Sequence, residues 1–412
     1  MISVGEAHEL IQAALPAPAV ESMAFTEVAG QVLAQDIVAP HPQPRFTNSA
    51  MDGFAVRAVD VQGASSEGPV ALTCVDVVAA GVEAKVTIGP GECAQIMTGA
   101  PLPAGADAVV MVEQTSGYDQ ASVEVYHASQ AGDNLRRAGE EVKTGQVLIT
   151  AGVRIGPGEL GIIASCGLEQ VQVYRGPTVA LYGTGDELRE PGEDLLPGQI
   201  YNSNIPVLTR MVQLAGGEVA LSRVIGDSKD ALRTFLAEAI ETCQMVVSTG
   251  GVSMGRFDFV RDVMLELGVE ERFWKVAQKP GKPLFFGQSG SVMVFGLPGN
   301  PVSALIIFME YIWPTLEQFQ GLRPTGKLTA ILAEPFPVDG GKHRFLFGQV
   351  WLEEGCLRAA PTRKLGSHML TSALGANAIL DAPPGTGPLR AEDPVSVRLL
   401  PWGAIHARRA TP

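Results

Sequence analysis

The spacing of apolar and polar residues changes character several times along the 412-residue chain. The first residues, MISVGEAHELIQAALPAP, mix polar and apolar side chains at the period of an amphipathic helix. This helical N-terminal part ends near the proline-rich stretch APHPQPRF at 39–46. Helical periodicity returns at Pro157–Cys166. We therefore predict a discontinuous helical domain formed by residues 1–46 and 146–176.

Between these two segments the pattern is that of short valine-rich strands separated by glycine and proline. Such runs, bounded by turn residues, are typical of β-structure. We therefore predict an all-β domain inserted at 47–145. Its clearest strands are Ala71–Val78, Ala108–Glu113 and Ser122–Tyr126.

From 177 to 326, buried-type strands alternate with amphipathic helices, which predicts a doubly wound, mostly parallel α/β domain. Asn204 is the predicted cap of its first helix, which stops at Gly216. The last predicted helix is long, begins at Pro301 and is kinked at Pro314. The other predicted elements are strands at 178–182, 219–225, 244–248, 272–277, 283–287 and 291–296, a helix from Asp227 or Ser228 to Glu241, and a helix capped by Asp258.

After 327 the chain returns to short strands, such as His343–Val350 and Val395–Leu400. This pattern predicts a small C-terminal β domain at 327–412. The predicted fold class is thus multidomain α/β plus β, with four domains in one chain. The length alone, too great for one ordinary core, favours three or four domains.

Composition and charge limit the partners. Apolar residues make up 46% of the chain and charged residues 18%, which is globular composition. The net charge of −14 disfavours broad binding to nucleic acids or to anionic membranes. Any anionic substrate must therefore be held by a local cluster of Lys or Arg.

The five cysteines are odd in number and widely spaced, which argues against a disulfide framework or a structural zinc site. Glu6 and Glu9 interrupt the first apolar stretch, so it does not have the pattern of a secretion signal. The apolar run Ala304–Met309 is too short to span a bilayer. We expect a soluble, cytoplasmic protein.

One motif is misleading. Residues 156–161, GPGELG, match the dinucleotide pattern GxGxxG, but no typical βαβ unit surrounds them and Glu159 would face the pyrophosphate. We interpret this segment as the start of a helix.

Four loops of the α/β domain carry the candidate chemistry, because ligands of open parallel sheets bind outside the carboxyl ends of the strands. Their glycines let the backbone approach a ligand closely, and two of the loops end at helix N-termini, where free N–H groups bind anions. One such loop alone is usually an ordinary capped turn, whereas four on one sheet edge favour a site. The loops are GTGDE at 183–187, GDS at 226–228, STGGVSMGRFD at 248–258 and GLPGNP at 296–301.

Carboxylates come from three of these loops. Clustered oxygen ligands beside phosphate suit Mg²⁺, which prefers one or two carboxylates together with phosphate and water. The candidate metal ligands are Asp186, Glu187, Asp227 and Asp258, although Asp227 and Asp258 could simply cap helices.

The required local positive charge lies in KVAQKPGKP at 275–283, where Lys275, Lys279 and Lys282 are close in sequence. Like charges on a stiff turn repel one another unless an anion relieves them. A solvated basic hairpin is the simpler alternative, but Pro280 and Pro283 make the turn stiff and favour an anion site.

With these motifs in view, the chain resembles the molybdopterin molybdenumtransferases, the family of the bacterial MoeA proteins and the gephyrin E domain. The order and spacing of the motifs agree from end to end. They are NSAMDGFA at 48–55, MTGAPLPAGAD at 97–107, NLRRAGEE at 134–141, GGVS at 250–253, KPGKP at 279–283, GLPGNPVSA at 296–304 and GSH at 366–368.

The resemblance implies the insertion of molybdate into adenylylated molybdopterin, with Mg²⁺ as cofactor and release of AMP. It also implies a homodimer in which each active site lies between the α/β domain of one subunit and the inserted β domain of the other. The partners implied are the two substrates, a molybdopterin adenylyltransferase and molybdoenzyme chaperones.

Site residues carried over by motif fall into two groups. The resemblance implies catalytic roles around the adenylylated pterin and Mg²⁺ for Asp52, Thr98, Glu187 and Asp258. It implies substrate binding by Arg136, Ser253, Lys275, Lys279, Lys282, Pro298, Pro301, Ser303 and Ser367.

The sequence departs from the family pattern at three places. Glu141 stands where Asp is expected, Arg256 and Phe257 precede Asp258 where an acidic residue is frequent, and Phe347 stands where Arg is usual. If that arginine helps to bind molybdate, Arg344, His343 or Lys342 must compensate.

Two other functions stay open at this point. A molybdopterin adenylyltransferase would resemble the 177–326 domain, but the other domains would then have no role. A non-catalytic scaffold of the gephyrin type is the second alternative. Apart from Phe347, the expected site residues are intact, which favours the enzyme.

Overall fold

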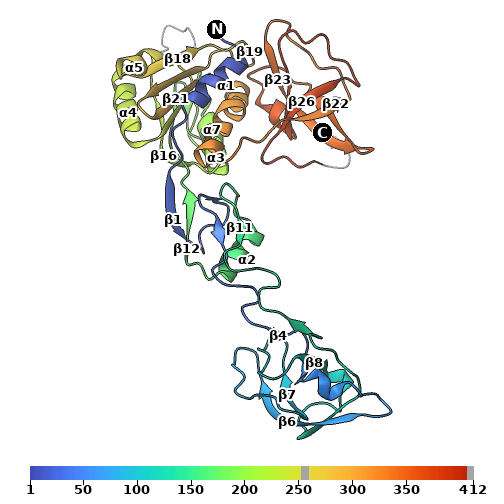
Figure 1. Cartoon of the computed structure of the whole chain (residues 1–412). Coiled ribbons are helices and arrows are strands. Elements are labelled where there is room, and N and C mark those ends of the chain that lie inside the picture. The colour runs from blue at the N-terminus through green and yellow to red at the C-terminus, as the bar shows by residue number, and fades with distance from the viewer. Residues whose placement is uncertain (252–258, 406–412) are drawn as a thin grey trace. The chain divides into compact units, whose positions relative to one another are not determined.

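The computed structural model describes residues 1–251 and 259–405 of the chain (Figure 1). Two compact units are distinguished. One comprises residues 1–34, 152–155 and 170–412, and the other comprises residues 35–151 and 156–169. Among the described residues, no helix has the length and apolar character needed to cross a membrane.

The first unit contains a six-stranded sheet in the order β16-β13-β17-β21-β20-β18. The first four strands run parallel to their neighbours, and β20 and β18 are added antiparallel. The mostly parallel sheet expected from the sequence is therefore present. Its strands are β13 (Thr178–Thr184), β16 (Glu218–Ile225), β17 (Met245–Thr249), β18 (Glu270–Trp274), β20 (Phe285–Ser289) and β21 (Val292–Leu297).

Helices cover both faces of this sheet (Figure 1). Successive side chains of a strand point to opposite faces. Val179 and Leu181 thus join the core beneath α1, α3, α6 and α7, whereas Ala180 and Tyr182 join the core beneath α4 and α5. The helices are α1 (Val4–Ala13), α3 (Asn204–Leu214), α4 (Lys229–Thr242), α5 (Val260–Glu266), α6 (Pro301–Ile307) and α7 (Trp313–Phe319).

The long helix after β21 is interrupted by a π-helical segment, Phe308–Ile312. Pro314 follows directly, and a proline inside a helix removes one backbone hydrogen bond and crowds the preceding turn. The irregularity predicted at Pro314 is therefore present, but it occupies the turn before the proline.

Asn204 does not cap its helix, so that prediction was wrong. The cap position of α3 is Ser203, and the Asn204 side-chain amide instead donates to Thr249 Oγ1 and to the carbonyl of Gly299, each at 2.8 Å. The amide is used in these two tertiary hydrogen bonds instead of in a cap, and the sequence pattern could not show this. At α4 the open choice is resolved, because Ser228 Oγ accepts the N–H of Ala231.

The helical N-terminal part is shorter than predicted. Helix α1 ends at Ala13, far before the stretch at 39–46, because Pro16 and Pro18 cannot continue a helix. The following residues form a three-stranded sheet in the order β1-β12-β2. Its strands are β1 (Val20–Ala24), β2 (Val32–Leu33) and β12 (Gln170–Tyr174).

The second unit is built on a five-stranded sheet in the order β8-β5-β7-β6-β9, around buried residues such as Phe54 and Val110. Helix α2 begins at Pro157, and Glu159 Oε2 accepts the N–H of Gly156 at 2.9 Å, which confirms the helix-start interpretation of GPGELG. The elements are β3 (Ile37–Val38), β4 (Asn48–Ser49), β5 (Gly53–Val56), η1 (Ala58–Val61), β6 (Val70–Val78), β7 (Glu92–Ile96), β8 (Ala108–Met111), η2 (Val112–Gln114), β9 (Ser122–Val125), β10 (Leu135–Arg136), β11 (Val147–Ile149) and α2 (Pro157–Ser165).

The C-terminal segment closes into a small barrel, because β23 pairs with both β24 and β25 in the ring β23-β24-β22-β26-β25. The short strand β19 adds to β23 from outside the ring. The four-domain division of the chain stays a prediction. The remaining elements are β14 (Leu188–Arg189), β15 (Ile200–Tyr201), β19 (Gln278–Lys279), β22 (Leu328–Leu332), β23 (His343–Glu353), β24 (Cys356–Pro361), η4 (Leu370–Ala373), β25 (Ala378–Ala382) and β26 (Pro394–Leu399).

Candidate functional site

The four loops predicted to carry chemistry meet at the carboxyl edge of the parallel strands. The N–H of Gly250 donates to the carbonyl of Leu297 at 2.9 Å, which joins the loops after β17 and β21. The N–H of Asp227 donates to Asp186 Oδ1 at 3.0 Å, which joins the loops after β13 and β16. Residues 252–258, with the expected Ser253 and Asp258, lie outside the described residues.

Glycine is required where the loop after β17 turns. Gly250 and Gly251 have φ of +92° and +66°, and a Cβ on Gly251 would lie 2.4 Å from Val260 Cγ2. Any other residue would be strained and would collide with helix α5. The two glycines thus let the loop backbone lie close against α5.

The carboxylates of Asp186, Glu187 and Asp227 are all exposed at this edge. Glu187 folds back over Gly185, where an added Cβ would lie 2.2 Å from Glu187 Oε2. Among the residues that the structure describes, no group of three or more His, Cys, Asp or Glu is arranged to hold a metal ion. The structure therefore brings Asp186 and Asp227 together, and the metal-ligand assignments stay predictions.

The three lysines belong to one hydrogen-bonded turn at 275–283, the lysine turn. Lys275 Nζ lies 3.7 Å from the centre of the Trp274 ring, a cation–π contact. Lys279 Nζ lies 3.7 Å from Asp339 Oδ2, and Lys282 is exposed. The N–H of Val276 donates to the carbonyl of Lys282 at 3.0 Å, so the chain folds back on itself between the lysines.

The predicted residues around α6 are also brought together. The N–H of Val302 donates to the carbonyl of Ser367 at 3.2 Å, and Asn300 Nδ2 donates to Ser367 Oγ at 3.4 Å. Pro301 occupies the first helical turn, and Ser303 in the same turn is buried. Pro298 is buried as well, and its carbonyl accepts the hydroxyl of Thr249. Ser367 thus lies at the start of α6 although the two segments are far apart in sequence.

In the second unit, Asp52 and Thr98 form a pair. Asp52 Oδ1 accepts the backbone N–H of Thr98 at 2.7 Å and its hydroxyl at 2.9 Å. These two hydrogen bonds lower the pKa of Asp52, so the carboxylate is ionised at neutral pH. Arg136 is exposed on β10, which pairs with β4 just before Asp52 in the chain.

Phe347, the residue expected from the resemblance to replace an arginine, is buried in the structure. Its side chain is 3% exposed and belongs to the same hydrophobic core as Phe345. Arg344, on the same strand, is 6% exposed and is the register partner of Lys279. Burial lowers the pKa of Arg344, against the opposing charge of Asp339. Arg344 therefore lies on the strand that pairs with Gln278 and Lys279.

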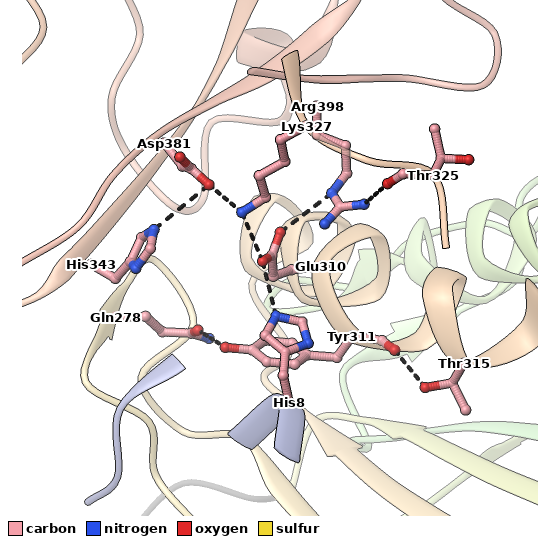
Figure 2. Close-up of polar contacts among 10 residues, drawn as sticks. All are labelled: His8, Gln278, Glu310, Tyr311, Thr315, Thr325, Lys327, His343, Asp381 and Arg398. Carbon is pink, nitrogen blue, oxygen red and sulfur yellow. Dashed lines mark hydrogen bonds and ion pairs between the residues drawn. The ribbon is translucent and has the colours of Figure 1, made fainter. Parts of the chain in front are cut away.

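One buried polar cluster, shown in Figure 2, could not be predicted from the sequence. Glu310, in the π-helical segment, is 3% exposed. Its carboxylate accepts from His8 Nε2 and Lys327 Nζ, each at 3.0 Å, and lies 3.4 Å from Arg398 Nε. Lys327 also pairs with Asp381. An acidic residue inside an apolar run gives no clue to partners so distant in sequence.

The electrostatics of this buried cluster are balanced by cations. Burial alone would raise the pKa of Glu310, but the hydrogen bond from His8 and the charges of Lys327 and Arg398 lower it overall. The pKa of Asp381 is lowered in the same way, because His343 and Lys327 outweigh its burial. The two carboxylates are therefore charged and paired inside the first unit.

Comparison with known proteins defines the class to which this fold and site belong. Three family models match in order: the MoeA N-terminal region (domains I and II) over residues 2–167, a probable molybdopterin binding domain over 180–318 and the MoeA C-terminal region (domain IV) over 329–400. The chain belongs to the MoeA family of molybdopterin molybdenumtransferases, which are enzymes.

Individual relatives agree along almost the whole chain. A molybdopterin molybdenumtransferase of Bacillus subtilis is 34% identical, with 93% of each chain covered. Molybdopterin molybdenumtransferase 2 of Mycobacterium tuberculosis is 36% identical, with 93% of this chain and 96% of that protein covered. The crystal structure of a Pyrococcus horikoshii MoeA protein superimposes with a TM-score of 0.84 at 33% identity, covering 97% of this chain and 99% of that one.

Proposed function

We propose that this chain inserts molybdate into adenylylated molybdopterin, with release of AMP and formation of the molybdenum cofactor. The observation that carries the proposal is the convergence of four glycine-rich loops at the carboxyl edge of the sheet, with Asp186 and Asp227 in contact. The names of its relatives, molybdopterin molybdenumtransferases, support the same reaction.

The main task of such a site is to offset the electrostatic repulsion between its two reactants. Molybdate is an oxyanion and the dithiolene of molybdopterin is rich in electrons, so the two reactants repel each other. In the proposed site Lys275, Lys279 and Lys282 hold molybdate and the anionic parts of the pterin and offset this repulsion. Arg344, buried beside Lys279, supplies the further positive charge for which position 347 has no arginine.

The exposed carboxylates at the sheet edge are of the ligand type that a hard divalent cation prefers. Their oxygens belong to Asp186, Glu187 and Asp227, and the first and third are already joined by a backbone hydrogen bond. We propose that they hold Mg²⁺ together with Asp258, through a few carboxylates plus phosphate and water. Bound Mg²⁺ would neutralise charge on the pyrophosphate-like linkage to adenylate.

Residues of the inserted domain complete the proposal. Thr98 keeps Asp52 ionised through two hydrogen bonds, and Asp52 is thereby available as a fixed negative group. We propose that Asp52, Thr98 and Arg136 act in the active site of the partner subunit of a homodimer. Further proposed partners are a molybdopterin adenylyltransferase and molybdoenzyme chaperones, in the cytoplasm.

The direct test supplies purified protein with adenylylated molybdopterin, Mg²⁺ and molybdate. Release of AMP and reconstitution of a molybdenum-free apoenzyme are measured together. Both are expected, and both should depend on molybdate. Binding of the pterin without any release of AMP would indicate a scaffold, and formation of adenylylated molybdopterin from ATP would indicate the adenylyltransferase.

Removing the cations of the turn is expected to weaken molybdate use. With both Lys279 and Lys282 replaced by alanine, the molybdate KM should rise more than about tenfold, because charge-assisted contacts each contribute about 1.5–3 kcal/mol. The molybdate dependence of AMP release measures this. Lys143→Ala, at an exposed lysine of the inserted domain, is the control and should change nothing. An unchanged molybdate KM in the double variant would return these lysines to a solvated hairpin.

Removing the metal is expected to stop the reaction. Chelation of Mg²⁺ should abolish AMP release, and Asp227→Asn should raise the Mg²⁺ concentration needed for half-maximal rate about tenfold or more, since one carboxylate ligand is lost. A titration with Mg²⁺ measures the shift. Asp230→Asn, at an exposed carboxylate nearby on α4, should leave the titration unchanged. The same Mg²⁺ requirement in both variants would contradict the assignment of Asp227.

A further inference from the structure

A buried glutamine joins the lysine turn to the long helix. Gln278 is 1% exposed and Tyr311 is 1% exposed. The Tyr311 hydroxyl donates to Gln278 Oε1, and Gln278 Nε2 donates to the carbonyl of Gly281 at 2.9 Å. Figure 2 shows the first of these contacts, with Gln278 pointing from its strand toward the tyrosine. Both ends of one carboxamide are therefore used.

The turn also packs directly on this helix. Gly281 has φ of +82°, and a Cβ there would lie 2.6 Å from Ile307 Cδ1. Only glycine permits this close approach in this conformation. The turn thus has two attachments to one helix: a packing contact at Ile307 and, through Gln278, a hydrogen bond at Tyr311.

The helix is irregular where it holds the turn. Glu310 and Tyr311 belong to the π-helical segment, and single π-helical turns inside helices are frequent at functional sites. Glu310, next to Tyr311 in the chain, is fixed by the cation cluster described above. The ring of His8 stacks on that of Tyr311 with centroids 4.9 Å apart. The hydroxyl of Tyr311 is therefore held in one place.

Gln278 and its acceptor Gly281 each stand next to one of the two lysines in the chain. Gln278 directly precedes Lys279, and Gly281 directly precedes Lys282. A lysine has a long flexible stem, so its ammonium group can reach a range of positions around its Cα, and the backbone sets which spacings two such groups can reach. We propose that Gln278 and Tyr311 are positioning residues that set the spacing of Lys279 and Lys282 for a tetrahedral oxyanion. This inference rests on the proposed function, in which that oxyanion is molybdate.

The test separates binding of molybdate from every other step. Tyr311→Phe keeps the ring and its stacking but removes the hydroxyl. The molybdate KM should rise about fivefold, the usual effect of one hydrogen bond on an equilibrium. Both kcat and the KM for adenylylated molybdopterin should stay within about twofold. Gln278→Met, which removes both contacts at similar volume, should raise the molybdate KM by about tenfold or more.

A matched control comes from the same helix. Thr315→Val removes a buried hydroxyl that donates to the backbone carbonyl of Tyr311 at 2.7 Å. It should lower thermal stability about as much as Tyr311→Phe does, and it should leave the molybdate KM unchanged. Combining Tyr311→Phe with Gln278→Met should add little to Gln278→Met alone, because both act through one chain of contacts.

The outcomes distinguish the inference from the function on which it rests. If the double alanine variant of Lys279 and Lys282 raises the molybdate KM but Tyr311→Phe does not, the positioning role is wrong and the anion site stands. If neither changes it, the anion site itself is wrong. A rise in the molybdate KM with Thr315→Val as large as with Tyr311→Phe would show a general loss of helix order, and would overturn the specific role of the hydroxyl.

Discussion

About a quarter of wild-type activity is expected to return when inactive Asp52→Ala and Asp258→Ala subunits are mixed in equal amounts and allowed to exchange. In the proposed homodimer each active site takes Asp52 from one subunit and Asp258 from the other. A heterodimer then has one site with both defects and one site with neither. About half of the dimers are heterodimers, so about a quarter of all sites are intact.

The measurement is AMP release from the mixture, compared with each parent alone. Both parents should be inactive. Tagging the two subunits differently and isolating doubly tagged dimers gives a sharper version, in which about half of the wild-type activity per dimer is expected. If doubly tagged dimers are isolated and remain inactive, both residues act within one subunit's site and the sharing proposal is wrong.

Replacement of Glu310 by glutamine is expected to lower the free energy of unfolding by about 3 kcal/mol. Breaking a buried ion pair leaves its partner charged without compensation, which costs about 3–5 kcal/mol. Arg398 and Lys327 would lose the carboxylate that both contact, although Lys327 keeps Asp381. Denaturant unfolding measures the change. Glu266→Gln is the matched control, because that carboxylate also contacts two cations but is 42% exposed. It should change the free energy of unfolding far less, because an exposed ion pair is solvated and screened.

The same cluster gives a pH dependence whose sign follows from its pKa shifts. The pKa of Glu310 is lowered from 4.5 and that of Asp381 from 3.8, so the unfolded chain binds protons more readily than the folded one. Their contribution to stability is therefore fully present above about pH 5 and is lost as the pH falls through the lowered folded values. The stability difference between wild type and Glu310→Gln should be constant from about pH 7 to 5 and shrink below about 4.5. A difference that grows on acidification would contradict the direction of these shifts.

The sheet edge could be predicted because it is marked locally. Glycines, prolines and capping residues fall where strands end and helices begin, as in the loops at 226–228 and 296–301. Parallel strands place their carboxyl ends together, so separate loops could be assigned to one site from the sequence alone. Asp186 and Asp227, 41 residues apart, indeed meet there.

The support of the lysine turn could not be predicted, because its signals are not local. Tyr311 lies in an apolar run that is typical of core, and its partner Gln278 is 33 residues away. The pairing of Glu310 in the π-helical segment has no local signature either, because its partners His8 and Arg398 lie near opposite ends of the chain. Asn204 misled for a related reason: its capping propensity was outweighed by two tertiary hydrogen bonds.

Strand β19 limits how far the α/β domain and the C-terminal barrel can be separated. It lies between β18 and β20 of the α/β sheet in sequence, yet its partner in space is β23 of the barrel. The N–H of His343 also donates to the carbonyl of Ala277 at 2.9 Å. The C-terminal barrel is therefore not an appendage that can be exchanged or truncated at a linker, because the strand leading into the lysine turn is completed by it. Gene fusions, domain swaps and shortened variants of this protein should respect that shared strand, and an α/β fragment ending near residue 326 would carry Lys279 on an unpaired edge.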